Sequence, residues 1–438
     1  MRKGNNMYFE RIGLVDENFA YRENMYVGTA GDRIVYIDTV APSDEQIEML
    51  GERYDGKGKV LMPAFVNSHG HSPMSLLRGY GEGLPLDRWL NELIFPFEAK
   101  LYDEAAYWGT LLTMAESIRY GIVSTTDMYD WNDSLVKAVV QAGCKNNIGR
   151  AVMNFTDDFV DNKAFNEMVE TIRLYDGFDY GKIITDASIH AEYTNNDKSI
   201  IAVVEAAKKY DVNMHVHVSE TQFEVEGCKE RHNGMSPVEY LNSLGVFDQP
   251  TVAAHCVWLS DADREILKAK NVTVASNPIS NLKLASGICE VQKLYDMGIN
   301  VGIGTDSASS NNNLDFFEEM KAFANLGKLS AGDAAAMSPD KVLYSATRAG
   351  ALAQGRNNCG LVKEGFKADL IVVDTEVPNM QPVHDMIYNL VFSASGKDVV
   401  LTMCDGKVLY KDGEYKTIDV EKTYAEVETA RKTILASL

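Results

Sequence analysis

Apolar and polar positions follow two different patterns along this chain. Near the start and again near the end, short runs rich in β-branched residues are separated by turn pairs such as Asp-Gly and Gly-Asp. The first end contains MYVGTAGDRIVYID, and the second contains ADLIVVD, VVLTMCDGKVLY and KDGEYKTI. Short strands joined by tight turns are typical of small antiparallel sheets. We therefore predict one composite β-domain, built from residues 1–60 and 361–438.

Between these ends, from residue 61 to 360, apolar runs alternate with stretches of helical periodicity. DEAAYWGTLLTMAESIRYG and DKSIIAVVEAAKKYD, for example, place apolar residues at i, i+3, i+4 and i+7. The eight apolar runs are VLMPAFVNS, GIVSTTDM, IGRAVMNF, DASIHAEY, VNMHVHVS, TVAAHCVW, NVTVASNP and INVGIGTD. Eight strands that are apolar on both faces and alternate with helices predict an α/β fold, a parallel (β/α)8 TIM barrel that carries the catalytic site.

The composition fits a globular enzyme and excludes some partners. Hydrophobic residues make up 45% of the chain and charged residues 24%, which is far from the composition of disordered proteins. With 42 Lys and Arg against 63 Asp and Glu, the net charge of -21 argues against nucleic acid or an anionic membrane as a partner. No run has the length of a membrane helix or the form of a signal peptide, which predicts a cytoplasmic protein. The six cysteines include no CxxC pair and are expected to be reduced thiols.

The histidines carry most of the functional information, because the chain has only eight and five of them stand where predicted strands end. These residues are His69, His71, His190, His217 and His255, with Asp306 at the end of the eighth run. The C-terminal strand ends of a barrel meet at one mouth, so all six are expected to converge there. His69 and His71 are two positions apart and face the same side of a strand. With His217 and Asp306 they predict a site for Zn²⁺ or a similar divalent metal.

Other polar residues near the strand ends need separate interpretation. The segment HVH also turns His215 inward, but a carboxylate follows His217 in HVSE, so we assign the ligand to His217 and leave His215 as a packing or supporting residue. Glu220 follows the fifth strand, where it can carry a proton to the substrate without binding the metal. The fourth run contains no lysine that could bridge two metals, so one ion is expected. His232 and His384 lie outside the strand-end pattern and are interpreted as structural.

These motifs resemble those of the amidohydrolase superfamily, and within it the branch of mononuclear deaminases and chlorohydrolases. MPAFVNSHGH resembles the first-strand motif of the family, which implies His69 and His71 as metal ligands. HVSE resembles the motif of the third ligand, His217, and GIGTD implies Asp306 as a ligand that also takes a proton from water. GLVKEGFKADLIVVD and VVLTMCDGKVLY resemble the family's small β-domain.

The resemblance also implies which residues act on the substrate. It assigns the proton shuttle to Glu220 and the contact with the metal's water to His255. LPLDRWLNELIFPFEAKL resembles a segment of the 5-methylthioadenosine/S-adenosylhomocysteine deaminases, in which a Trp and a Glu follow the first strand. Trp89 and Glu98 match these positions, and the family's Glu holds the ribose hydroxyls. His190 matches a substrate-contacting histidine on the fourth strand. A buried Trp and a solvated Glu on one amphipathic helix are the structural alternative.

Two further residues are assigned to substrate binding by their position. Arg150 stands near the end of the third strand, where the family's arginines meet the acidic end of some substrates; pairing with an internal carboxylate is the alternative. Ser310, four residues past Asp306, is a candidate hydrogen-bonding residue in a loop whose composition is otherwise ordinary.

Together the motifs predict a hydrolytic deaminase of adenosine-type nucleosides. The expected substrates are 5-methylthioadenosine, S-adenosylhomocysteine, 5′-deoxyadenosine and adenosine, and the products are ammonia and the inosine analogue. Zn²⁺ is the favoured metal, and Fe²⁺ and Mn²⁺ also suit three imidazoles and a carboxylate. One alternative is the same chemistry on guanine, a pterin, cytosine or an s-triazine, none of which has a diol for Glu98. Another is an inactive scaffold that acts as an interaction protein, although such a scaffold is expected to have lost metal ligands. A homo-oligomer is a family-level expectation.

Overall fold

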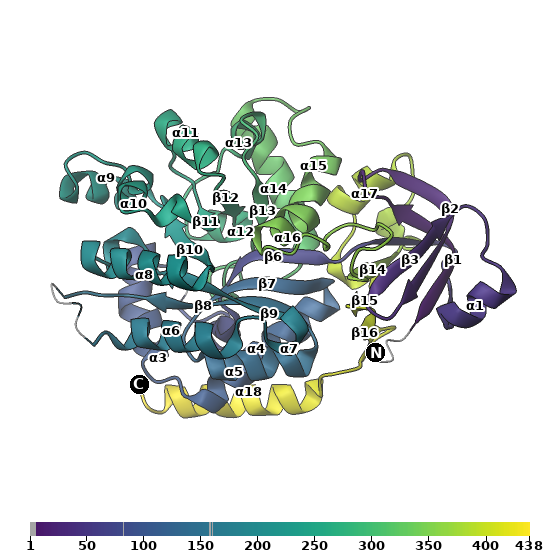
Figure 1. Ribbon diagram of the computed structural model, residues 1–438, viewed down its shortest axis with the longest axis horizontal. Helices are drawn as coiled ribbons and strands as arrows, with labels where there is room; N and C mark the ends of the chain where they lie inside the picture. Colours follow the sequence, from purple (N-terminus) through teal and green to yellow (C-terminus); the bar gives the residue numbers. More distant parts are fainter. Residues whose placement is uncertain (1–5, 82, 157–158, 160) are drawn as a thin grey trace.

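Eight parallel strands form a barrel at the centre of the computed structural model, which describes residues 6–81, 83–156, 159 and 161–438 (Figure 1). The strands are β6 (Phe65–Gly70), β7 (Ile122–Met128), β8 (Lys145–Val152), β9 (Ile183–Ile189), β10 (Asn213–Val218), β11 (Thr251–His255), β12 (Thr273–Ser276) and β13 (Val301–Ile303). Consecutive strands are neighbours in space, and a parallel bridge between Gly70 and Asp306 joins the last strand to the first. Each of the eight apolar runs contributes a strand, so the predicted TIM barrel is confirmed.

Helices lie between the strands and cover the outside of the barrel (Figure 1). The two helices taken as examples of helical periodicity are α4 (Asp103–Arg119) and α8 (Asp197–Tyr210). Asn196 caps α8, because its side chain accepts the N–H of Ser199 at 3.1 Å. The other described helices are α1 (Asp44–Leu50), α2 (Leu86–Trp89), α3 (Phe95–Glu98), α5 (Asn132–Ala142), α6 (Lys163–Tyr175), α7 (Phe178–Gly181), α9 (Gln222–Arg231), α10 (Pro237–Ser243), α11 (Asp261–Ala269), α12 (Pro278–Lys283), α13 (Val291–Asp296), α14 (Phe316–Ala331), α15 (Pro339–Tyr344), α16 (Gly350–Ala353), α17 (Met386–Phe392) and α18 (Val420–Leu435).

A second sheet stands beside the barrel and contains strands from both ends of the chain (Figure 1). Its strands run in the order β17 (Glu414–Tyr415), β16 (Lys407–Lys411), β15 (Val399–Cys404), β14 (Leu370–Asp374), β5 (Lys59–Pro63), β1 (Met7–Val15), β2 (Tyr21–Ala30) and β3 (Arg33–Asp38), with β4 (Glu52–Asp55) paired to β1. The composite β-domain is therefore confirmed. The sheet is mixed rather than antiparallel throughout, because β1 pairs in parallel with β4 and β5.

The exact domain boundaries stay a prediction, but the strands show where the two sheets separate. The first apolar run supplies two strands: β5 belongs to the small sheet, and β6 begins the barrel after Ala64. At the other end, α18 leaves the small sheet and packs against α4 of the barrel, along the lower edge of Figure 1. Arg119 of α4 donates to the carbonyls of Gly396 at 2.9 Å and Val399 at 3.0 Å, which ties the two parts together.

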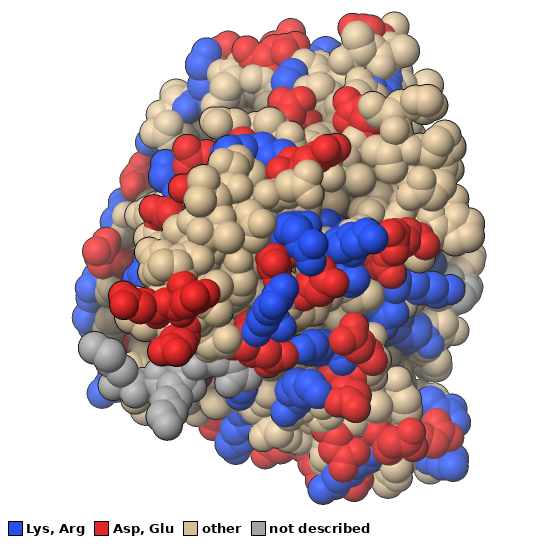
Figure 2. Space-filling model, turned by 90° about the vertical axis from the view of Figure 1, so that its right-hand side faces the viewer, with Lys and Arg blue, Asp and Glu red and all other residues tan. Residues whose placement is uncertain are grey.

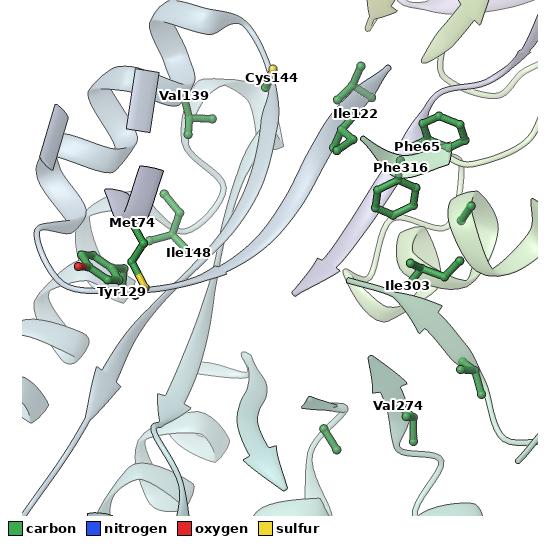
Figure 3. Packing of buried hydrophobic residues seen from close by; sticks show 14 of the residues in the cluster. Phe65, Met74, Ile122, Tyr129, Val139, Cys144, Ile148, Val274, Ile303 and Phe316 are labelled. Atoms are coloured by element: carbon green, nitrogen blue, oxygen red, sulfur yellow. The ribbon is translucent and has the colours of Figure 1, made fainter. Parts of the chain in front are cut away.

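Aromatic rings fill the space between the barrel and its outer helices (Figure 3). Phe65 on β6 stacks on Phe316 of α14 with ring centroids 5.1 Å apart, and it meets Phe317 edge-on at 5.0 Å. All three rings are buried. Burial of such large apolar side chains is the main favourable contribution to folding, and it holds the strand ends in fixed positions.

The surface and the cysteines agree with the sequence analysis. On the face that carries the small sheet, Lys and Arg side chains are interspersed with Asp and Glu (Figure 2). All six cysteines are buried and unpaired, as predicted. Within the described ranges, no helix combines the length and the apolar composition that crossing a bilayer requires.

Candidate metal centre and active site

The strand ends bring the predicted metal-binding residues together at the C-terminal mouth of the barrel. His69 lies on β6, His71 directly follows this strand, His217 lies on β10 and Asp306 follows β13. The backbone N–H of Asp306 donates to the carbonyl of His69 at 3.0 Å, which closes the barrel next to the site. Asp306 has a φ of 58°, a left-handed conformation that is uncommon outside glycine and typical of functional sites.

Three ring nitrogens and one carboxylate face a common position. The Nε2 atom of His71 lies 3.1 Å from Oδ1 of Asp306 and 3.4 Å from Nε2 of His217. The Nε2 atom of His69 lies 3.5 Å from the same carboxylate oxygen. The nitrogens of His69, His71 and His217 are all within 4.8 Å of one another, close enough to share one ion.

Hydrogen bonds to backbone carbonyls fix the orientation of two of these rings. The Nδ1 atom of His71 lies 2.6 Å from the carbonyl oxygen of Met128, and Nδ1 of His217 lies 2.6 Å from that of His190. A carbonyl can only accept a hydrogen bond, so each Nδ1 carries the proton. The Nε2 atom of each ring therefore keeps the lone pair that a metal needs.

His215 supports His69 from behind, which is one of the two roles left open by the sequence. The Nε2 atom of His215 lies 2.9 Å from Nδ1 of His69, and both rings are fully buried. On the other side of the His69 ring, Nε2 has no hydrogen-bond partner among the described residues. Burying a polar atom without a partner costs about 1–3 kcal/mol, and a bound cation would satisfy this atom. The residues present therefore fit a metal ion.

The electrostatics of the ligands suit a divalent cation. Burial lowers the pKa of His69 to about 3 and the pKa of His217 well below its usual range, so both imidazoles are neutral at neutral pH. Burial alone would raise the pKa of Asp306, but the neighbouring imidazoles of His69 and His71 lower it well below its ordinary value. Burial would lower the pKa of His71 as well, but the carboxylate of Asp306 raises it to about 9, so this imidazole releases a proton when a metal binds. His69 and His217 offer neutral nitrogens, and Asp306 offers a carboxylate.

Glu220 and His255 face each other beside the candidate metal ligands. The Nε2 atom of His255 lies 3.8 Å from Oε2 of Glu220, and its Nδ1 lies 2.9 Å from Oδ1 of Asn281. The hydroxyl of Ser286 donates to Oε1 of Glu220 at 3.1 Å. Burial raises the pKa of Glu220, so this carboxyl holds a proton more readily than an exposed one, as a general acid must.

The carboxylate of Glu224 fixes the backbone that carries Glu220. It accepts the N–H of Ser219 at 2.8 Å and the N–H of Glu220 at 2.7 Å. The carbonyl of Ser219 in turn accepts the N–H of Val257 at 3.1 Å and that of Trp258 at 2.9 Å. The turn that carries Glu220 is therefore tied both to α9 and to the loop after β11.

A cleft opens above the candidate metal ligands, and its wall contains the predicted nucleoside-binding residues. Trp89 at the end of α2, Glu98 at the end of α3 and His190 after β9 all line it. The same cleft is lined by His71, His217, Glu220, His255, Asp306 and Ser310. The hydroxyl of Tyr129 donates to Oε1 of Glu98 at 2.6 Å, and burial raises the pKa of Glu98 to about 7.

Arg150 lies away from this cleft, whereas Ser310 is part of it. Arg150 lines a neighbouring hollow, where its Nε lies 2.9 Å from Oε2 of Glu167 and its Nη1 contacts the carboxylate of Asp130. This is the ion pairing that the sequence analysis gave as the alternative role of Arg150. The hydroxyl of Ser310 donates to Oδ2 of Asp306 at 2.9 Å, so Ser310 contacts a candidate metal ligand.

Several supporting residues were not found by sequence reasoning. They are Tyr129, Glu224, Ser280, Asn281 and Ser286. Ser280 donates to Oδ2 of Asp306 at 2.6 Å, and Asn281 contacts His255. The segment NPISN, which follows the seventh predicted strand, places Ser280 and Asn281 at the barrel mouth, and that position was the available signal.

The fold and the site together define a barrel hydrolase whose strand ends present a ligand set suited to a divalent metal. Residues 60–409 match the model of the amidohydrolase family, and the chain belongs to this family.

Two curated relatives show how far the similarity extends. A 5-methylthioadenosine/S-adenosylhomocysteine deaminase of Dictyoglomus thermophilum is 39% identical over 95% of this chain and 95% of its own length. A 5′-deoxyadenosine deaminase of Methanosarcina mazei is 40% identical over 94% of this chain and 98% of its own length. The resemblance inferred from the motifs is therefore confirmed.

Solved structures agree with this assignment. An adenosine deaminase of Xanthomonas campestris with bound zinc superimposes with a TM-score of 0.92 at 30% identity, over 98% of this chain and 99% of that one. The atrazine chlorohydrolase of Arthrobacter aurescens has a TM-score of 0.88 at 19% identity, over 97% of this chain and all of that one, and so shares the fold. The relatives are named deaminases, and this chain is a hydrolase of carbon–nitrogen bonds.

Proposed function

We propose that this protein deaminates adenosine-type nucleosides by hydrolysis: 5-methylthioadenosine, S-adenosylhomocysteine, 5′-deoxyadenosine and adenosine. The observation that carries this proposal is the position of Glu98, which lines the same cleft as Glu220 and Asp306. A carboxylate can accept hydrogen bonds from both hydroxyls of a ribose, and Trp89 beside it offers an apolar face to the nucleoside. The names of the relatives, which are adenosine-type deaminases, support the same substrate class.

The residues of the site have distinct roles in this reaction. A divalent ion held by His69, His71, His217 and Asp306 would lower the pKa of a water molecule and so supply a nucleophile. Asp306 accepts the first proton of that water on Oδ1, because Oδ2 already receives hydrogen bonds from Ser280 and Ser310.

Glu220 and His255 act on the substrate side. Protonated Glu220 gives its proton to the ring nitrogen next to the amino-bearing carbon, which makes that carbon electrophilic. His255, held by Asn281, orients the attacking oxygen. The carbon–oxygen bond then forms, the proton on Asp306 passes to the amino group, and the carbon–nitrogen bond breaks to release ammonia. The remaining hydroxyl proton returns to Glu220, so atoms and charges balance.

Zn²⁺ is the proposed metal, and Fe²⁺ and Mn²⁺ fit the same ligand set. Bound zinc in the Xanthomonas campestris adenosine deaminase supports this choice. Elemental analysis of protein purified without added metal, followed by reconstitution with each ion, distinguishes the three. A cytoplasmic location and a homo-oligomeric state remain predictions.

Ammonia release from each of the four nucleosides, measured in the steady state with Zn²⁺ present, tests the proposed function. We expect turnover of at least one nucleoside, and a large loss of kcat/KM for it in Glu98→Gln, since the diol then loses a charged acceptor. Guanine, cytosine and an s-triazine serve as comparison substrates without a diol. Turnover of these alone, unchanged in Glu98→Gln, would instead favour chemistry on a free heterocycle.

A further inference from the structure

The active cleft continues outward into a second hollow, which we call the outer recess. The two share Leu86, Trp89, Leu90, Phe95, Tyr193 and Leu284 as lining residues. The recess adds Phe155 and Phe223, whose side chains are 71% and 80% exposed. The two rings extend the apolar surface of the cleft outward and offer an apolar ligand group a place to bind. The shared wall and the added rings make the recess predominantly apolar.

The cationic residues that line the outer recess, Arg231 and Lys283, already have partners within the protein. Both oxygens of Glu192 bind Arg231, at 3.1 and 2.8 Å. The Nζ atom of Lys283 donates to the carbonyl of Ser309 at 2.8 Å and also contacts the side chain of Asn312. Glu224 accepts the two backbone N–H groups described above.

The neighbouring hollow that contains Arg150 is also unfavourable for a negatively charged group. Asp130 and Trp131 lie between the cleft and the hollow that contains Arg150. The guanidinium of Arg150 is held by two carboxylates, those of Asp130 and Glu167. Lys163 also contacts Glu167, at 3.4 Å, but the hollow is lined by three further carboxylates, those of Asp103, Asp133 and Glu170, so negative charge exceeds positive charge there. Asp130 also lines the active cleft.

A bound nucleoside has only one orientation that suits these surroundings. The amino-bearing ring has to reach Glu220 and Asp306 at the inner end, and the ribose has to reach Glu98. The 5′-substituent is then directed away from the metal, toward the outer recess.

We propose that the outer recess selects an uncharged, apolar 5′-substituent, so that 5-methylthioadenosine and 5′-deoxyadenosine are preferred over S-adenosylhomocysteine. The homocysteine group carries a carboxylate, which would lose water next to aromatic rings without gaining a free cation among the described residues of the recess. This inference rests on the proposed function and specifies the substrate class of the same site.

Three substrates separate the effect of charge from the effect of length. They are 5-methylthioadenosine, S-adenosylhomocysteine and 5′-S-butylthioadenosine, which has a long but uncharged substituent. We expect kcat/KM for the butyl compound to lie within about threefold of that for 5-methylthioadenosine, and kcat/KM for S-adenosylhomocysteine to be at least about tenfold lower. Equal efficiency with S-adenosylhomocysteine would overturn the selectivity. An equal loss for both long substrates would overturn it too, because length would then be the cause.

Two substitutions of Phe223 test the effect of charge on substrate selection by changing the protein instead of the substrate. Phe223→Arg places a cation at the exposed rim and is expected to raise the ratio of kcat/KM for S-adenosylhomocysteine over 5-methylthioadenosine several-fold. Phe223→Gln removes the same ring without adding charge and is expected to leave this ratio low. An equal rise in both variants would overturn the role of charge. Absence of turnover with every nucleoside would overturn the proposed function itself, a result distinct from turnover without selectivity.

Discussion

The two ends of the active cleft are built in opposite ways. At the inner end, the ligand rings and carboxyls are held by a second contact, such as Met128 behind His71, Asn281 behind His255 and Ser286 beside Glu220. At the outer end, the recess is formed by apolar side chains, and Phe155 and Phe223 project largely into solvent. The inner end therefore holds its side chains with buried hydrogen bonds, whereas the outer end offers an apolar surface, to which we have assigned the selection of the 5′-substituent as a proposal.

The largest effect is expected from removing the charge at the inner end. Asp306→Asn should lower kcat/KM by about 10⁴-fold or more, because we propose this residue both as a metal ligand and as the acceptor of the water's proton. Metal content measured on the purified variant should also fall. Asp296→Asn, an exposed change at the end of α13, is the control and should retain full activity. Normal metal content and activity in Asp306→Asn would refute both roles.

Glu220→Gln is expected to lower kcat by about 10³-fold while the protein still binds its metal. The amide keeps the size of the side chain and can still accept the hydrogen bond from Ser286, but it has no proton to give the substrate ring. Single-turnover kinetics together with metal analysis check this prediction. Glu226→Gln, an exposed change on the neighbouring helix α9, is the matched control. A loss of metal in Glu220→Gln would argue that this residue is a ligand instead.

Glu224→Gln tests whether catalysis depends on the hydrogen bonds by which Glu224 holds the backbone of Ser219 and Glu220. One amide oxygen cannot replace two carboxylate oxygens, so either Ser219 or Glu220 would lose its N–H acceptor. We expect kcat to fall about 10–100-fold with little change in KM, as for other groups that orient a catalytic residue. The melting temperature, measured alongside the kinetics, separates this effect from partial unfolding. An unchanged kcat would show that the turn holds Glu220 without Glu224.

The smallest effect is expected from the titration of Glu98, which lies between the inner and the outer end of the cleft. Burial raises the pKa of Glu98 to about 7, so this group gains its negative charge as the pH rises through 7. The ionised carboxylate is the better acceptor for the ribose hydroxyls, and KM should therefore fall by up to about tenfold between pH 6 and pH 8. The same titration of Glu98→Gln should show no such step. A pH-independent KM in the unmodified protein would contradict the diol-binding role.

Most residues of the inner end could be predicted from the sequence alone. The strands of a parallel barrel all end at the same mouth, so residues at their C-terminal ends lie close together. His69, His71, His217, His255 and Asp306 could be grouped by their place at the ends of apolar runs, without knowledge of any contact. The residues that support them could not be grouped in this way. Ser286 and Glu224 lie in a loop and on a short helix, and nothing in their local pattern shows which way they face.

Arg150 shows why the outer parts were harder to predict. It lies on β8, where Ala151 faces the cleft and Arg150, one position earlier, faces the outer helices. Alternate residues of a strand point to opposite sides, but β8 is buried on both faces, so the apolar pattern does not show which set points inward. The first apolar run is similar: its pattern does not show that Lys59–Pro63 and Phe65–Gly70 belong to different sheets.

The pairing of β5 with β14 sets the order in which this protein can be completed during synthesis. β5 ends at Pro63 and β14 begins at Leu370, so the ribosome makes the whole barrel between these two neighbouring strands. At a synthesis rate of about 5–20 residues per second, roughly 15–60 s pass between the synthesis of β5 and that of its partner strand β14. During this interval the strand presents unpaired backbone groups and an apolar face, the features that promote aggregation of nascent chains. Growth temperature and chaperone supply should therefore affect the yield of this protein chiefly by acting on the half-finished small sheet.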